Sequence, residues 1–217
     1  MTAPLNGRVF VTGLGAVSPL GLNVESTWQG MVNGVSGIDY ITAFDLDGFE
    51  TRFAAEVRGF DPTDYLEKKE ARRMDRFAQF AAAASFQALE QAELKPKDVD
   101  PYRVAAIVGS GIGGIITLSQ QYDILKEKGP RRVTPFLIPM MLADMAPAQV
   151  SMLTGATGAN FCPVSSCSSG ADAIGQAWEM LRRNEADVVL AGGSEAPICP
   201  IAMAGFSSLR ALSRHNE

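Results

Sequence analysis

The chain has 217 residues, of which 47% are hydrophobic and 20% are charged, and its net charge is −5. This length and composition are typical of one folded domain with a sizeable core. The negative charge provides no general attraction to nucleic acid or to an anionic membrane, so an acidic partner would need a local basic patch.

The amino terminus and the cysteines narrow the class of protein and its expected cellular setting. "MTAPLNGRVFVTG" lacks the layout of a secretory signal, and no stretch of the sequence is typical of a membrane span. Cys162, Cys167 and Cys199 are an odd number of cysteines without CxxC spacing or a histidine cluster. A disulfide framework and a zinc site are both disfavoured, no metal ligands are predicted, and a reducing, cytoplasmic setting is expected.

The first part of the chain predicts a strand, a turn and a helix. An apolar strand over 8–12 enters a glycine-rich turn at Gly13-x-Gly15. Ser18 stands where a dinucleotide-binding fingerprint has its third glycine, so a closely packed turn is favoured over a nucleotide site. Asn23 is expected to cap a helix that Gly34 ends, and a strand is plausible over 51–57.

The rest of the chain alternates helices with apolar strands. Residues 61–94 are strongly helical, and the nearly apolar part over 77–94 is expected to be buried against a sheet. Apolar strands are predicted over 104–108, 158–166 and 186–196. Further helices are predicted over 115–128, 140–153, 170–186 and 200–209. This alternation predicts one compact α/β unit whose sheet is covered on both faces.

Cys167 lies in "VSSCSSGADAIG", between a predicted strand and a predicted helix. The first turn of a helix has unpaired N–H groups and the positive end of the dipole, which favour a thiolate and can stabilise an oxyanion. These residues alone leave two interpretations open, a nucleophile and a small buried residue in a turn. Cys162 and Cys199 are interpreted as packing residues because neither is expected next to a helix start.

Several motifs occur in the order seen in β-ketoacyl-acyl-carrier-protein synthases. They are "VTGLGAVSPLG", "ARRMDRFAQFA", "GSGIGG", "SSCSSG", "ADVVLAGGSEA" and "GFSSLRALS". Over essentially its whole length the chain resembles the elongating type II enzymes of bacterial fatty-acid synthesis. This resemblance implies a thiolase-like fold of two duplicated halves, each a five-stranded mixed sheet with helices on both faces. Residues 1–217 would be the N-terminal half, and the C-terminal half would be absent from this chain.

The resemblance also implies an activity and its residues. Cys167 would accept an acyl group from acyl carrier protein, before decarboxylative condensation with malonyl carrier protein. The substrates would be carried on phosphopantetheine, with no bound cofactor. Ile112 would be a chain-length gate, and Leu137 and Ile138 would reach across a homodimer interface. The implied acyl-pocket residues are Gly111, Ile112, Ile115, Leu137, Ile138 and Phe206. The implied carrier-binding residues are Lys69, Arg72, Arg73, Arg131, Arg132 and Arg210.

The resemblance also implies that this chain would contain only part of the family's condensation machinery. The family uses two histidines and a lysine that lie in its second half, and His215 matches neither histidine and is expected to be exposed. The chain is therefore interpreted as a fragment of a synthase, as one subunit of a split enzyme, or as a stand-alone module that binds acyl groups or carrier protein. A polyketide ketosynthase subunit is the main enzymatic alternative, because its family shares the same motifs.

Overall fold

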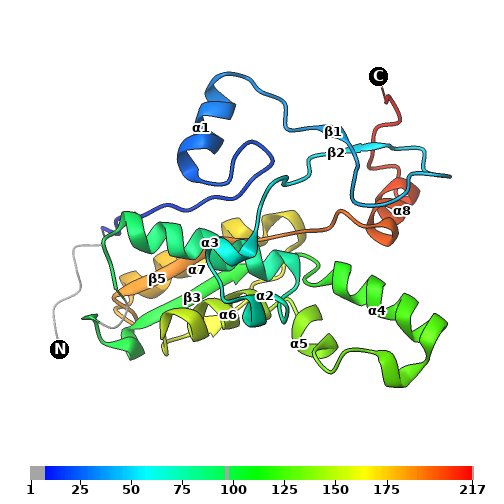
Figure 1. Cartoon of the computed structure of the whole chain (residues 1–217). Helices are drawn as coiled ribbons and strands as arrows, with labels where there is room; N and C mark the ends of the chain where they lie inside the picture. Colours follow the sequence, from blue (N-terminus) through cyan, green and yellow to red (C-terminus); the bar gives the residue numbers. More distant parts are fainter. Residues whose placement is uncertain (1–7, 96–97, 217) are drawn as a thin grey trace.

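The computed structural model describes residues 8–95 and 98–216 (Figure 1). Among these residues, no helix combines the length and the apolar character needed to cross a membrane. The elements, in chain order, are α1 (Val24–Val32), β1 (Asp39–Tyr40), β2 (Phe53–Ala54), η1 (Pro62–Asp64), α2 (Lys68–Ala71), α3 (Arg76–Gln91), η3 (Pro101–Arg103), β3 (Val104–Gly109), α4 (Ile115–Lys128), η4 (Pro130–Arg132), α5 (Leu137–Met141), α6 (Met145–Thr154), β4 (Asn160–Phe161), η5 (Ser166–Ser168), α7 (Ser169–Arg182), β5 (Val188–Gly193) and α8 (Pro200–Ser208).

Strand β3 is the centre of a three-stranded parallel sheet in the order β4-β3-β5. All of its residues are buried, because helices cover both of its faces. Ala106 and Val108 pack into a core with α3 and α6, whereas Ile107 points to the opposite face and packs against Ala173 and Ala177 of α7. The predicted α/β arrangement with helices on both faces is therefore confirmed for this sheet.

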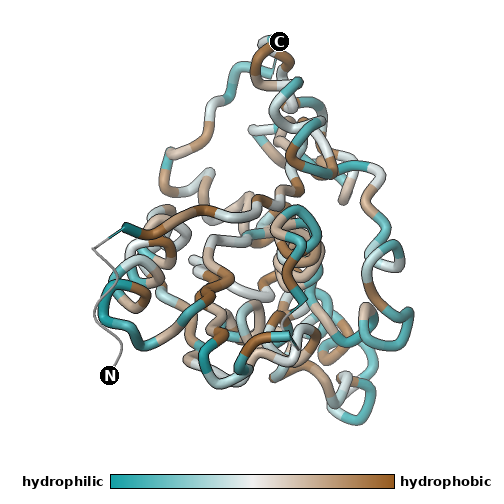
Figure 2. Tube along the Cα trace, turned by 90° about the vertical axis from the view of Figure 1, so that its left-hand side faces the viewer, coloured by the Kyte–Doolittle hydropathy of each residue, from teal (hydrophilic) through white to brown (hydrophobic). Residues whose placement is uncertain are grey.

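The predicted five-stranded mixed sheet is wrong for the described residues. The strands form two separate sheets, and β1 and β2 pair only with each other, antiparallel. The strand predicted over 8–12 does not form, and Phe10 and Val11 are 68% and 79% exposed. Figure 2 shows this apolar stretch along the outside of the molecule, directly after the grey amino-terminal trace.

The segment that follows binds to α3 instead of to a strand. The N–H of Leu14 donates to Gln91 Oε1 at 2.5 Å, and the N–H of Ala16 donates to Gln87 Oε1 at 3.1 Å. Glycine permits this close approach, since a Cβ on Gly15 would lie 1.8 Å from the carbonyl oxygen of Ala84. The side chains of α3 thus satisfy backbone groups that a sheet would otherwise pair. The close packing predicted at Gly13-x-Gly15 is confirmed, but the turn lies later, where Ser18 and Gly21 exchange backbone hydrogen bonds.

The long helical stretch predicted over 61–94 is broken before α3. Asp75 has extended backbone and caps α3, accepting a hydrogen bond from the N–H of Phe77 at 3.4 Å. Its second carboxylate oxygen accepts from the N–H of Thr117 in α4 at 2.8 Å, and its side chain is buried. This carboxylate joins the starts of two helices, which explains why one continuous helix does not form.

The other predicted helices differ from the structure in two places, one of which is the helix predicted over 170–186, since α7 ends at Arg182. Asn23 caps α1 as expected, and α4 spans the predicted 115–128. The helix predicted over 140–153 is divided into α5 and α6, because Leu142 is extended and the carbonyl of Met141 accepts from the N–H of Gly114 at 3.1 Å.

Glycines let the start of α7 lie directly on the sheet. A Cβ on Gly109, the last residue of β3, would lie 2.2 Å from the carbonyl oxygen of Ser169. A Cβ on Gly193, the last residue of β5, would lie 2.7 Å from the Cα of Gly170. Real Cβ atoms do not approach backbone this closely, so only glycine allows α7 to begin at the carboxyl ends of β3 and β5.

We predict that Gly109→Ala lowers the free energy of unfolding by about 1–3 kcal/mol, because the added methyl overpacks backbone that cannot withdraw. The matched control is Gly192→Ala in β5, where an added Cβ meets nothing within 4 Å, and a change below about 0.5 kcal/mol is expected. Urea denaturation followed by circular dichroism measures both. Equal midpoints for the two variants would contradict the close approach of α7.

Candidate active site

Cys167 lies at a sharp turn between β4 and α7. It is the middle residue of η5, and α7 begins two residues later. The preceding residue, Ser166, has φ of +57°, a conformation that residues other than glycine rarely adopt. The Cys167 side chain is exposed at the end of this turn. This strand–turn–helix geometry is the one that nucleophile elbows use to present a reactive side chain.

Hydrogen bonds from neighbouring serines hold the turn. The buried hydroxyl of Ser169 accepts from the N–H of Ser165 at 3.0 Å and donates to the carbonyl of Ser166 at 2.7 Å. The Ser165 hydroxyl donates to the carboxylate of Asp172, in the first turn of α7. The backbone directly before Cys167, at Ser165 and Ser166, is therefore tied to α7, which stabilises the strained φ of Ser166.

Cys167 opens into a cavity of about 510 Å³ at the carboxyl ends of β3 and β5. Of the predicted pocket residues, Gly111, Ile112 and Phe206 line this cavity with Cys167. Ile112 and Phe206 also line a second cavity of about 420 Å³, where they meet Ile115. The structure thus brings four of the six predicted acyl-pocket residues to two adjoining cavities beside Cys167.

The other two predicted pocket residues lie elsewhere. Leu137 and Ile138 begin α5, and Ile138 is 59% exposed. Neither residue lines the cavity of Cys167 within the described chain. Their assignment to a dimer interface stays a prediction.

A carboxylate that sequence reasoning missed, Glu195, also lines the Cys167 cavity. Its Oε1 accepts from the hydroxyl of Ser110 at 3.0 Å, and its Oε2 accepts from the N–H groups of Gly111 and Ile112 at 2.6 Å and 3.2 Å. The sequence does contain a signal, because Glu195 directly follows the apolar, glycine-rich stretch "VVLAGGS" at the end of a predicted strand.

The other two thiols have different surroundings. Burial raises the pKa of both Cys162 and Cys199 above that of an ordinary thiol. The expectation that Cys199 is not next to a helix start is wrong, since Cys199 directly precedes α8, but its side chain is only 5% exposed. Cys167 is consequently the one exposed thiol of the three.

The predicted carrier-binding residues are exposed, but three separate segments carry them. Lys69, Arg72 and Arg73 lie in or just after α2, Arg131 and Arg132 lie in η4 beyond the end of α4, and Arg210 follows α8 (Figure 1). Arg73 lies over the ring of Phe136 at 4.6 Å. No described carboxylate lies within salt-bridge distance of any of the six, so their charges are available to an acidic partner.

The described part of the chain places no imidazole beside Cys167. His215, the only histidine of the sequence, is exposed near the carboxyl end, as expected. Its backbone N–H donates to the hydroxyl of Ser213 at 3.2 Å. Among the same residues, no three His, Cys, Asp or Glu side chains are grouped to hold a metal ion. The cavity therefore offers the Cys167 thiol, the Glu195 carboxylate, serine side chains and the apolar side chains of Ile112 and Phe206.

Comparison with known proteins agrees with this geometry. The chain is 45% identical over 212 residues to 3-oxoacyl-[acyl-carrier-protein] synthase 2 of Staphylococcus aureus, covering 98% of this chain and 51% of that protein. The protein of the same description from Synechocystis sp. is 45% identical over 210 residues, covering 97% and 50%. The chain thus spans about half the length of the curated relatives it matches.

Solved structures match the fold over the same extent. A beta-ketoacyl synthase from Burkholderia phymatum superposes with a TM-score of 0.83 at 29% identity, covering 96% of this chain and 52% of that one. The ishigamide ketosynthase/chain length factor superposes with a TM-score of 0.86 at 27% identity, covering 94% and 51%.

A family model decides the assignment. Residues 6–217 match the model described as beta-ketoacyl synthase, N-terminal domain. The resemblance inferred from the sequence motifs is confirmed, and the chain belongs to the beta-ketoacyl synthase family.

Proposed function

We propose that this chain is the acyl-accepting part of a condensing enzyme of the 3-oxoacyl-[acyl-carrier-protein] synthase II type, which elongates fatty acids. The observation that carries the proposal is the exposed Cys167 at a hydrogen-bonded elbow, in a cavity that it shares with Gly111, Ile112 and Phe206. The family membership and the curated relatives support the reaction class.

In the first step, the sulfur of Cys167 attacks the carbonyl carbon of an acyl group held as a thioester on the phosphopantetheine of acyl carrier protein. A new carbon–sulfur bond to Cys167 forms, the bond to the pantetheine sulfur breaks, and the released thiol takes the proton that Cys167 has lost. The N–H of Cys167 has no hydrogen-bond acceptor among the described residues, so it is free to stabilise the transient oxyanion.

In the second step, malonyl carrier protein loses CO₂, and the resulting carbanion attacks the acyl carbonyl on Cys167. A carbon–carbon bond forms, the carbon–sulfur bond to Cys167 breaks, and 3-oxoacyl carrier protein leaves. Decarboxylation requires groups that stabilise an enolate, and the cavity contains no described histidine or lysine. We therefore assign this step to the C-terminal half of the enzyme or to a partner subunit.

The proposed partners are acyl carrier protein and a second copy of the chain. The exposed and unpaired basic residues on α2, on η4 and after α8 would steer an acidic carrier surface, while long-range attraction mainly accelerates encounter. The exposure of Ile138 on α5 is consistent with a contribution to the site of a second protomer. Residues 1–217 are proposed to form a single N-terminal thiolase-like domain.

A polyketide ketosynthase subunit is the second candidate. It is favoured by one observation, the match to the ketosynthase/chain length factor structure. The identity of 27% to that chain is far below the 45% shared with the two synthases, so elongation of fatty acids is the preferred function.

We predict that incubation with an acyl carrier protein thioester adds one acyl group to Cys167, detected by mass spectrometry of the intact chain and its peptides. Cys167→Ala should abolish the addition while leaving non-covalent binding of the carrier protein unchanged. Cys162→Ala is the matched control and should be acylated like the unaltered chain, since burial raises the pKa of the Cys162 thiol. A folded chain whose Cys167 stays unmodified would refute the proposal.

We also predict that Ser169→Ala slows acylation of Cys167 about tenfold to a hundredfold, because the elbow loses the hydroxyl that positions the thiol. The free energy of unfolding should fall by about 1–3 kcal/mol, since two backbone groups lose their partner.

Ser168→Ala is the matched control, because the exposed Ser168 hydroxyl has no partner among the described residues. Acylation reactions quenched at set times, at a fixed concentration of acyl carrier protein thioester, compare the rates of Cys167 acylation in the two variants. Equal rates for the two variants would show that the Ser169 hydrogen bonds do not position Cys167.

A further inference from the structure

Glu195 holds the loop that carries Ile112, which lines both cavities beside Cys167. This loop, residues 110–114, joins β3 to α4. The Glu195 carboxylate accepts from the Ser110 hydroxyl and from the N–H groups of Gly111 and Ile112. The Ser110 hydroxyl in turn accepts from the N–H of Gly113 at 3.0 Å. One carboxylate therefore organises the loop, directly or through Ser110.

The backbone that carries Glu195 is itself anchored. The N–H of Ser194 donates to the carbonyl of Gly109 at 2.9 Å, and the Ser194 hydroxyl donates to the carbonyl of Phe77 in α3 at 2.6 Å. Gly111 fits closely beside the carboxylate, since a Cβ there would lie 2.9 Å from Oε2. Because hydrogen bonds to an ionised acceptor are roughly twice as strong as neutral ones, this anchored carboxylate determines where the loop lies.

Ile112 is the residue of this loop that faces both cavities. It lines the cavity of Cys167 and also the adjoining one, whose other residues include Ile115, Ile201 and Leu209. The two cavities have Ile112 and Phe206 in common, so an acyl chain on Cys167 that extends from the first cavity into the second would pass next to these two side chains. The N–H of Ile112 donates to Glu195 Oε2, and its β-branched side chain has few rotamers, so a shift of the Ile112 backbone away from the cavities requires its N–H to leave the carboxylate.

From this geometry we infer that Glu195 is a positioning residue that determines which acyl chain lengths Cys167 accepts, by holding Ile112 between the two cavities. The inference rests on the proposed function, because it concerns the acyl group on the same cysteine. It differs from that proposal in assigning selectivity to a residue whose described side-chain hydrogen bonds are all with the loop.

The test uses N-hexyl and N-dodecyl iodoacetamide, which alkylate Cys167 when its sulfur displaces iodide. This reaction needs neither carrier protein nor acyl transfer. It therefore measures how chain length affects access to Cys167 even if Cys167 is not acylated from a carrier thioester. The rate for each probe is divided by the rate for iodoacetamide, which removes changes in thiol reactivity. Peptide mass spectrometry separates Cys167 from Cys162 and Cys199.

For Glu195→Ala we expect the ratio of the dodecyl to the hexyl alkylation rate to rise about tenfold. This figure is the lower end of the rate discrimination that an apolar pocket achieves for one methylene group. Glu195→Gln should keep the ratio of the unaltered chain within about threefold, because its amide oxygen can still accept from both N–H groups. Glu195→Asp keeps the charge but is shorter, so it should shift the ratio like Glu195→Ala. This variant also serves if Glu195→Ala fails to fold.

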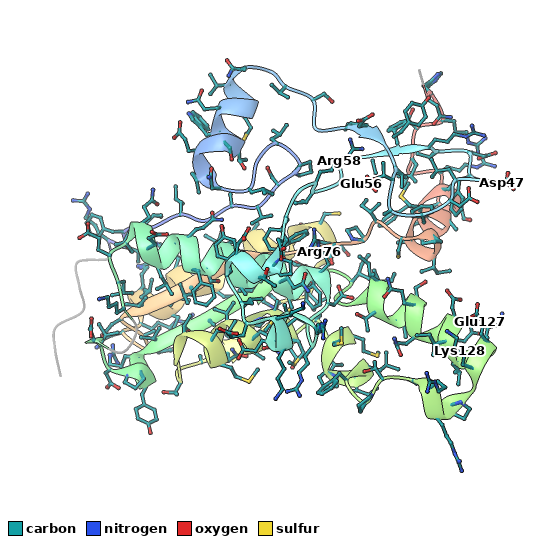
Figure 3. All side chains as sticks on the ribbon, viewed as in Figure 1. Asp47, Glu56, Arg58, Arg76, Glu127 and Lys128 are labelled. Carbon is teal, nitrogen blue, oxygen red and sulfur yellow. The ribbon has the colours of Figure 1, made fainter. Side chains whose placement is uncertain are left out.

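Glu56→Ala is the matched control. The Glu56 carboxylate likewise accepts from two backbone N–H groups, those of Thr42 and Ala43. Glu56 follows β2 and is labelled in Figure 3. It does not line the cavity of Cys167, so the ratio should stay unchanged. The inference is overturned if Glu195→Ala and Glu195→Asp leave the ratio unchanged, if Glu195→Gln shifts it as much as they do, or if Glu56→Ala shifts it equally.

Discussion

The contact between the start of α7 and the ends of β3 and β5 is the constraint on which the rest of the site depends. Parallel strands end at one edge of their sheet, and in such folds ligands bind beyond that edge. Here the helix start approaches so closely that Gly109 and Gly193 admit no side chain. The elbow with Cys167 is thereby fixed relative to both neighbouring loops, one after each strand. A larger distance would separate the thiol from the walls of its cavity.

Two hydrogen-bonded devices refine this arrangement. The Ser169 hydroxyl binds the N–H of Ser165 and the carbonyl of Ser166, which keeps the elbow in its uncommon conformation. Glu195 performs the corresponding task on the opposite wall by gathering the N–H groups of the loop after β3. Both devices act on backbone groups, which have fewer alternative positions than long side chains. A site built this way is organised before a substrate arrives.

Large apolar side chains remain exposed outside this site. Phe10 and Val11 lie on the extended amino-terminal segment, Trp28 lies on α1, and Ile174 and Trp178 lie on α7. Where such side chains form a contiguous patch, the patch marks a surface that associates with another protein surface. Their exposure agrees with the proposal that the active protein contains a further half and a second protomer.

The sequence by itself determined the order and type of the main elements, because the apolar run of β3 and the helical pattern of α4 are local properties. Its motifs also determined the family and indicated Cys167, since the strand–turn–helix context is written in consecutive residues. Tertiary structure alone decided that Leu14 and Ala16 bind to side chains of α3, that Asp75 interrupts a helical stretch, and that Glu195 binds the N–H of Ile112. Each of these depends on groups distant in sequence: the glutamines of α3, the N–H of Thr117, and the loop after β3. Periodicity describes which face of an element is apolar, but it contains no information on which distant backbone group a carboxylate or a strand will meet.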